Sequence, residues 1–88
     1  MSITEVKIHH VSDDKVRAYV SVVFDHCFIV RDLKVIDGDE RLFVAMPSKR
    51  MKSGFFRDTA HPLNAETRLM VEREVLRAYN RAISSPVR

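Results

Sequence analysis

The sequence predicts an α+β domain in which an antiparallel sheet of four or five strands packs against one long C-terminal helix. Apolar residues recur at every second position through the first 46 residues and at helical spacing after residue 64. At 88 residues the chain fits one domain, 1–88, with the sheet over about 2–58 and the helix over about 65–83. Such a small domain buries only about 60% of its unfolded surface, so we expect it to dimerise, by sheet edges or an exchanged helix.

Alternating polarity defines the first two strands, at residues 3–10 and 16–24. Ser12, Asp13 and Asp14 are expected to form the turn between them. In the second strand the alternation is regular, and its apolar face consists of Val16, Ala18, Val20, Val22 and Phe24. The next two residues, Asp25 and His26, indicate a tight hairpin, although this pair is not the favoured Asn-Gly type.

The third strand, residues 27–36, changes phase within its length. Its apolar positions have one parity up to Val30 and the opposite parity from Leu33, so a regular strand would bury Asp32. A β-bulge inserts one residue and resets which face the side chains point to. We therefore predict a bulge near Arg31 and Asp32.

The remaining sheet signals are short. A turn at residues 37–40 precedes a fourth strand at 42–46, which Pro47 ends because proline cannot donate to a sheet ladder. A weak fifth strand is expected through residues 55–57. Between these two strands the sequence PSKRMK predicts a flexible cationic loop.

The last third of the chain predicts one amphipathic helix. Asn64 is the expected N-cap, Glu66 suits the positive end of the helix dipole, and the Ser84, Ser85, Pro86 sequence ends the helix. One half of the cylinder is expected to pack on the sheet and contains Leu69, Val71, Val75, Leu76, Ala78, Tyr79, Ala82 and Ile83. Arg68 and Glu72 also fall in this half, where they could pair with each other at an edge or reach a second subunit.

The outward half of this helix carries a ridge of cations, formed by Arg73, Arg77 and Arg81 with Glu74 close by. This ridge could extend a nucleic-acid surface or enter a groove, and a solvated helix face is an equal alternative. Met70 is expected to be exposed, which would add to a contact surface on the helix.

Charge is distributed unevenly along the chain. Residues 1–48 carry six Lys and Arg against eight Asp and Glu, or −2, whereas residues 49–88 carry nine against four, or +5. Concentrated positive charge is typical of a site for a polyanion, and a solubilising surface explains the count equally well. No membrane partner is expected because the sequence has neither a signal peptide nor a long apolar run, and the single cysteine, Cys27, indicates a cytosolic protein.

The most cationic stretch is the candidate binding site. We expect phosphate contacts from Ser48, Lys49, Arg50, Lys52 and Arg57, and the alternative is an ordinary solvated loop. Phe55 and Phe56 could stack on bases, but such a pair more often places one ring in the core and one at its rim.

Structural roles are expected for the residues around this stretch, which are Pro47, Phe56, Asp58, His61 and Pro62. Asp58 can accept from the backbone of the turn or pair with Arg57, and His61 can cap or hydrogen-bond across the loop. We expect PSKRMK to contact phosphate and FFRDTAHPLN to act as the scaffold that orients it and begins the helix.

Enzymatic activity is not expected. Cys27, His61 and Asp58 could supply a nucleophile, a base and an orienting group, but nothing in the sequence brings Cys27 to His61, and no glycine-rich phosphate loop is present. The histidines and Cys27 lack zinc-ligand spacing, so we predict no metal, no cofactor and no small-molecule substrate.

Four segments together resemble the SpoVG family (stage V sporulation protein G): FIVRDLKVIDG, LFVAMPSKR, GFFRDTAHPLN and the helix start ETR. The resemblance covers the chain from Ile3 to about Tyr79. The central motif of the family matches Met46, Pro47, Ser48, Lys49 and Arg50. A second motif matches Phe56, Arg57, Asp58, His61 and Pro62. The helix after Tyr79 and the pair His26 and Cys27 depart from any family pattern.

The resemblance implies a small bacterial cytosolic protein that is homodimeric through its sheet, binds DNA and RNA, and regulates gene expression, with ties to septation, sporulation or virulence in different bacteria. A different class of function stays open. In that alternative the chain is a protein-interaction module of the division or regulatory machinery, which uses Met70, Arg68, Glu72 and the helix face without contacting nucleic acid.

Overall fold

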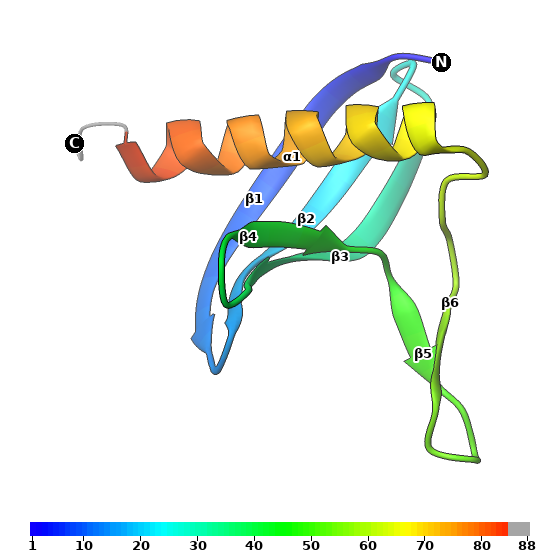
Figure 1. The fold of residues 1–88 in the computed structure, drawn as a ribbon. Coiled ribbons are helices and arrows are strands. Elements are labelled where there is room, and N and C mark those ends of the chain that lie inside the picture. Colours follow the sequence, from blue (N-terminus) through cyan, green and yellow to red (C-terminus); the bar gives the residue numbers. More distant parts are fainter. Residues whose placement is uncertain (85–88) are drawn as a thin grey trace.

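The computed structural model describes residues 1–84, which form a four-stranded antiparallel sheet, a separate two-stranded ribbon and a C-terminal helix (Figure 1). The elements are β1 (Ile3–Asp13), β2 (Val16–Phe24), β3 (Phe28–Asp37), β4 (Leu42–Ala45), β5 (Ser48–Arg50), β6 (Phe56–Asp58) and α1 (Ala65–Ser84). The sheet is a meander with the strand order β1-β2-β3-β4, so each strand pairs with its neighbour in sequence. The predicted α+β fold is confirmed.

One layer of apolar side chains between the sheet and α1 forms the core. Its buried members are Ala18, Val20, Val22, Phe24, Leu33, Val35, Val44, Met46, Val71, Val75 and Tyr79. The predicted inward face of the second strand is therefore confirmed for Ala18, Val20, Val22 and Phe24. Val16 is half-buried and does not belong to this layer, because a register shift between Val16 and Ala18 pairs it with Ile36. α1 runs across one face of the sheet (Figure 1).

The predicted bulge in β3 is confirmed. Val22 pairs with Val30 and Val20 pairs with Leu33, so both Arg31 and Asp32 lie opposite a single residue of β2. Asp32 has φ of 68°, a left-handed conformation that Asp tolerates better than most residues, and its side chain is exposed. The extra residue thus keeps Val30 and Leu33 on the core side and Asp32 in solvent.

The tight β2–β3 hairpin is confirmed as well. Asp25 and His26 have φ of 51° and 58°, the left-handed values that a type I′ turn requires, and Cys27 N–H donates to the Phe24 carbonyl at 3.0 Å. The amino-terminal segment holds this turn: Ser2 N–H donates to Oδ1 of Asp25 at 2.9 Å, and His26 N–H donates to Oγ1 of Thr4 at 3.0 Å.

The start of the helix agrees with the sequence. Oδ1 of Asn64 accepts a hydrogen bond from Thr67 N–H at 2.8 Å, which makes Asn64 the predicted N-cap. The helix is described through Ser84, and the predicted stop signals Ser85 and Pro86 lie outside the described residues.

The predicted apolar half of the helix is too wide. Val71, Val75 and Tyr79, at steps of four, are at most 6% exposed, but Leu69 is 62% and Ile83 55% exposed. A helix resting on one sheet buries only a narrow stripe, so residues about 100° to either side of that stripe reach solvent. Ala82 lies in line with the stripe, seven residues after Val75, and it is exposed because the C-terminal end of α1 extends past the sheet (Figure 1).

The structure also bears on two predictions for residues beside this stripe, the exposure of Met70 and the pairing of Arg68 with Glu72. Met70, expected to be exposed, is half-buried. Arg68 and Glu72 are half-buried too, and the structure shows no ion pair between them within residues 1–84.

The end of the sheet differs from the prediction in three respects. The fourth strand ends at Ala45, one residue earlier than expected, and the weak fifth strand exists as β6 but does not join the main sheet. It pairs with β5, which lies in the segment predicted to be a flexible loop. The loop prediction is wrong for Ser48–Arg50, which form one strand of a hairpin, whereas Met51 and Lys52 do lie in the connecting turn.

Candidate nucleic-acid interface

The two short strands form a ribbon, called here the basic arm (residues 48–58), that extends away from α1 and from the main sheet (Figure 1). Its register pairs Ser48 with Asp58, Lys49 with Arg57, and Arg50 with Phe56. Directly opposed residues of an antiparallel pair share a face. Lys49 and Arg57 therefore project together on one side of the arm.

The tip of the arm is closed by backbone hydrogen bonds. Met51 N–H donates to the Phe55 carbonyl at 2.7 Å, and Gly54 N–H donates to the Met51 carbonyl at 2.9 Å. Gly54 has φ of 94°, which only glycine adopts without strain. Lys52 lies in this turn and is exposed, so the cations of the arm extend to its tip.

The two ends of the arm are joined at its base through one hydrogen-bond acceptor. The carbonyl oxygen of the buried residue Pro47 accepts hydrogen bonds from Thr59 N–H at 2.8 Å and from Thr59 Oγ1 at 3.2 Å. Beyond this junction every residue from 48 to 59 is exposed. The arm thus presents its side chains to solvent while its two ends are held together.

The cross-strand pair of Lys49 and Arg57 is electrostatically unfavourable. Like charges directly opposite each other destabilise a β ladder. Within residues 1–84 the structure gives neither residue an ion pair, and Asp58 projects to the other face of the ribbon, opposite Ser48. A bound anion would relieve this repulsion.

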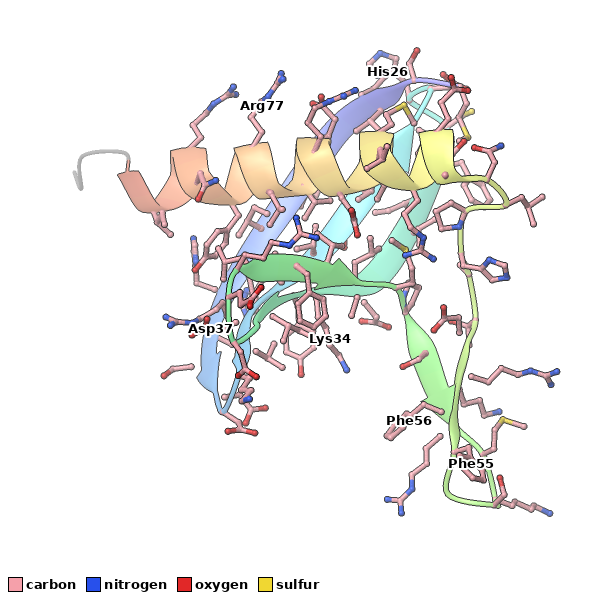
Figure 2. All side chains as sticks on the ribbon, in the orientation of Figure 1. His26, Lys34, Asp37, Phe55, Phe56 and Arg77 are labelled. Atoms are coloured by element: carbon pink, nitrogen blue, oxygen red, sulfur yellow. The ribbon has the colours of Figure 1, made fainter. Side chains whose placement is uncertain are left out.

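Both phenylalanines of the arm are exposed. Phe55 is 76% and Phe56 69% accessible, so the expectation of one core ring and one rim ring is wrong. Phe56 lies opposite Arg50, which places an aromatic ring and a cation on the same face. Figure 2 shows both rings on the arm, away from the packed core.

The helix ridge has a different electrostatic character from the arm. Oε2 of Glu74 lies 3.9 Å from Nε of Arg73 and 3.7 Å from Nη1 of Arg77, so one carboxylate offsets part of the charge. Arg81 is exposed at the end of the ridge. Arg77 projects from the side of α1 away from the arm (Figure 2). The structure therefore gathers the arm residues together and does not bring the helix ridge beside them within one chain.

The arm and the prolines that flank it lie within a match to a known protein family. The SpoVG family model matches residues 1–81. This chain belongs to the SpoVG family. A protein of Bdellovibrio bacteriovorus is 56% identical over 85 residues, covering 97% of this chain and 79% of that protein.

More distant SpoVG relatives match over similar lengths. A Myxococcus xanthus protein is 53% identical over 81 residues, which cover 92% of this chain and 82% of its own. A Caldicellulosiruptor bescii protein is 45% identical over 86 residues, 97% of this chain and 98% of its own. All three bear the name "Putative septation protein SpoVG".

The second family motif continues from the arm into the segment that leads to the helix. The Pro62 carbonyl accepts a hydrogen bond from Nδ1 of His61 at 2.9 Å, so His61 acts on its own neighbour and not across the loop. Pro62 is half-buried and, with Pro47 and Met46, lines an apolar cavity of about 210 Å³ near the start of α1. Residues 55–59 are exposed, so the packed part of this SpoVG motif begins at Ala60, and before it only Thr59 is tied to the body of the domain, through Pro47.

Sequence reasoning missed two features of the arm in this SpoVG chain. The pairing of Lys49 with Arg57 depends on the hairpin register, for which Gly54 at the turn was the available signal. The junction between Thr59 and Pro47 left no recognisable pattern.

Metal-binding and membrane-spanning features are absent from the described part of the chain. Residues 1–84 contain no group of three or more His, Cys, Asp or Glu side chains placed to hold a metal ion. The helix of the described chain lacks the apolar length needed to cross a membrane. Cys27 is exposed in the β2–β3 turn.

Proposed function

We propose that this SpoVG family protein binds nucleic acid through the basic arm and acts as a homodimeric regulator connected with septation. The observation that carries the proposal is the cross-strand pair of Lys49 and Arg57, two exposed cations on one face to which no carboxylate of residues 1–84 is paired. An anionic ligand bound between these two cations would offset their repulsion. Phosphates of DNA or RNA supply that charge.

The binding mode follows from the shape of the arm. Arg50 and Lys52 add two exposed cations beyond the central pair, so several phosphates can be contacted at once. Such contacts release counterions and give affinity that does not depend on base sequence. Phe55 and Phe56, both exposed, offer rings for unpaired bases.

The homodimer is supported by exposed apolar side chains around the core. Phe28 is 64%, Leu63 92% and Leu69 62% accessible in the isolated chain. A second copy of the chain that covered these side chains would remove their apolar surface from water. Two arms in a symmetric dimer would double the number of phosphates within reach.

The test is a salt titration of oligonucleotide affinity. Lys49→Gln with Arg57→Gln removes two phosphate contacts, so the slope of log affinity against log salt should flatten by about 1.8 for duplex DNA and about 1.4 for single strands. At 0.1 M salt a difference of 1.8 in slope corresponds to about 60-fold weaker duplex binding. Sedimentation equilibrium on the same samples should give twice the chain mass of 10.2 kDa.

A matched control separates arm contacts from net charge. Lys15→Gln with Arg41→Gln removes the same charge from exposed positions in other turns, and it should leave the slope nearly unchanged. An arm variant with the wild-type slope would contradict the proposal, and so would a control that flattens the slope equally.

The protein-interaction module remains a second candidate because Leu69 and Ile83 are exposed on α1. It predicts a partner whose binding survives the arm substitutions, is lost on Leu69→Asp, and responds little to salt. Pull-down of a division protein with those three properties, together with no oligonucleotide binding, would favour it over the first proposal.

A further inference from the structure

The face of the sheet opposite α1 carries an ordered row of polar and aromatic side chains. His9 of β1 pairs with Tyr19 of β2, Tyr19 pairs with Lys34 of β3, and Lys34 pairs with Ala45 of β4. Paired residues share a face, and the core-side positions of β2 alternate with Tyr19, so the row lies on the outer face. Figure 2 shows Lys34 projecting from the sheet on the side away from α1.

Cations surround Tyr19 on this face. A hollow of about 450 Å³ is lined by Lys7, Ile8, His9, Tyr19, Val20, Ser21, Arg31 and Asp32. Lys7 and Arg31 are exposed, and Lys34 stands beside Tyr19 in the row, against the single carboxylate of Asp32. The bulge in β3 puts Arg31 and Asp32 at this place, opposite Ser21. The balance of charge around Tyr19 is therefore positive.

Arg17, at the register shift between Val16 and Ala18 on β2, is already engaged. Its Nη2 donates to Oδ2 of Asp37 at 2.7 Å, and this hydrogen bond together with the attraction of that carboxylate raises the pKa of Arg17 above its usual value. The cations left for a ligand are thus Lys7, Arg31 and Lys34, to which the structure assigns no ion pair within residues 1–84.

The two tyrosines of the chain differ in their contacts: one has a partner within the described residues and the other has none. Tyr79 is buried, and its ring lies 5.6 Å from the ring of His10. Tyr19 is half-buried, and within residues 1–84 the structure gives its side chain neither a ring contact nor a hydrogen bond. Packing explains Tyr79 and leaves the outward ring of Tyr19 without a structural partner among these residues.

A second aromatic residue lies on the same face. Phe43 of β4 pairs with Ile36 and is 41% exposed. Since strands lie about 4.8 Å apart and residues two positions apart on one strand about 6.6 Å apart, Phe43 is roughly 12 Å from Tyr19. Each ring has room for a base of its own.

We propose that this outer face is a second contact surface for single-stranded nucleic acid, with Tyr19 stacking on a base and Lys7, Arg31 and Lys34 contacting phosphates. The proposal rests on the proposed function and adds a surface to the arm. Unpaired bases stack on aromatic rings of a sheet, whereas the bases of a duplex are already stacked on each other. The ligand is therefore a single strand.

The row also leads towards the arm. Ala45, at its end, is the last residue of β4, and the arm begins three residues later at Ser48. A strand of nucleic acid that crosses the sheet along this row would reach the base of the arm. Stacking on the sheet and phosphate contacts on the arm would then act on one ligand.

Tyr19→Trp provides a direct reporter, because the chain has no tryptophan of its own. Titration with a 20-nucleotide single strand of mixed sequence should quench the indole emission of this variant with the same midpoint as binding measured by anisotropy. A duplex of the same sequence should quench it much less. Binding without quenching would overturn the proposal.

Affinity measurements on two further variants test the energetic role of the ring. Tyr19→Thr keeps strand propensity but removes the ring, and it should weaken single-strand binding by about 5- to 150-fold with an unchanged salt slope. Tyr19→Phe should bind like the wild type, and so should Val23→Thr on the same strand and face. Both Tyr19 variants and the wild type should unfold at similar urea concentrations, since Tyr19 faces away from the core.

The outcomes separate this inference from the function of the arm. If Tyr19→Thr binds single strands like the wild type while the arm variant flattens the salt slope, the sheet surface is overturned and the arm stands. If the wild type binds no oligonucleotide, both are overturned. If the indole emission of Tyr19→Trp shifts with protein concentration alone, a second copy covers this face and the proposal is again overturned.

Discussion

The helix packing makes a quantitative prediction about two residues of α1. Val75 is 0% exposed at the centre of the buried stripe, whereas Leu69 is 62% exposed. Val75→Ala removes two buried methyl groups, worth about 0.8 kcal/mol each, and leaves a cavity that adds a further penalty, so we expect a loss of about 2–3 kcal/mol. Leu69→Ala removes a larger side chain but should cost less than about 1 kcal/mol, because most of that side chain is already in water.

The measurement is urea unfolding followed by the far-ultraviolet circular dichroism of the helix. Val75→Ala should lower the unfolding midpoint without changing the slope, and it should lower the Tm by about 10–20 °C in a domain of this size. Dilute protein is needed so that the chain is compared as a monomer.

One result would refute the helix orientation. If Leu69→Ala destabilised dilute protein as much as Val75→Ala, the helix would have to be rotated about its axis from the position described. A cost of Leu69→Ala that grows with protein concentration would instead place Leu69 in the interface of the proposed dimer.

Two further predictions concern the ends of elements. Asn64→Ala removes the acceptor of Thr67 N–H and should lower the free energy of unfolding in urea by about 1 kcal/mol, whereas Asn64→Asp should retain the cap. Equal stability of the wild type and both variants would show that the cap contributes nothing. Gly38→Ala would place a Cβ 2.6 Å from the Arg41 carbonyl oxygen and 3.1 Å from the Phe43 ring. We expect this crowding to lower the Tm, at a cost in stability of about 1–3 kcal/mol. An unchanged Tm would mean that the turn rearranges without cost.

The strands of the main sheet could be predicted because each records its burial in a local pattern. The change of parity between Val30 and Leu33 even located the bulge, since no regular strand buries both. Likewise, the polar side chain of Asn64 marked the helix start, because an N-cap acts within three residues of its own position. Local physics was sufficient in these cases.

Features that depend on which strand or sheet face a residue packs against could not be predicted from local patterns. The strand Ser48–Arg50 is entirely exposed, so it has no apolar alternation and read as a loop. Leu69 lies at a plausible angle on the helix, but how wide a stripe the sheet covers is decided by the tertiary contact. The facing of Lys49 and Arg57 required the register of the hairpin, which the turn sets and the individual residues do not.

The single junction at Pro47 has a consequence for how this domain can change over evolutionary time. Residues 48–59 are exposed and belong to no buried cluster, so substitutions there draw little on the narrow stability margin of a small domain. The core beneath α1 has no such freedom, because its residues fill one shared layer. If the arm binds the proposed ligand, single substitutions in it would therefore alter binding at little risk to folding, whereas substitutions beneath α1 would put the fold itself at risk.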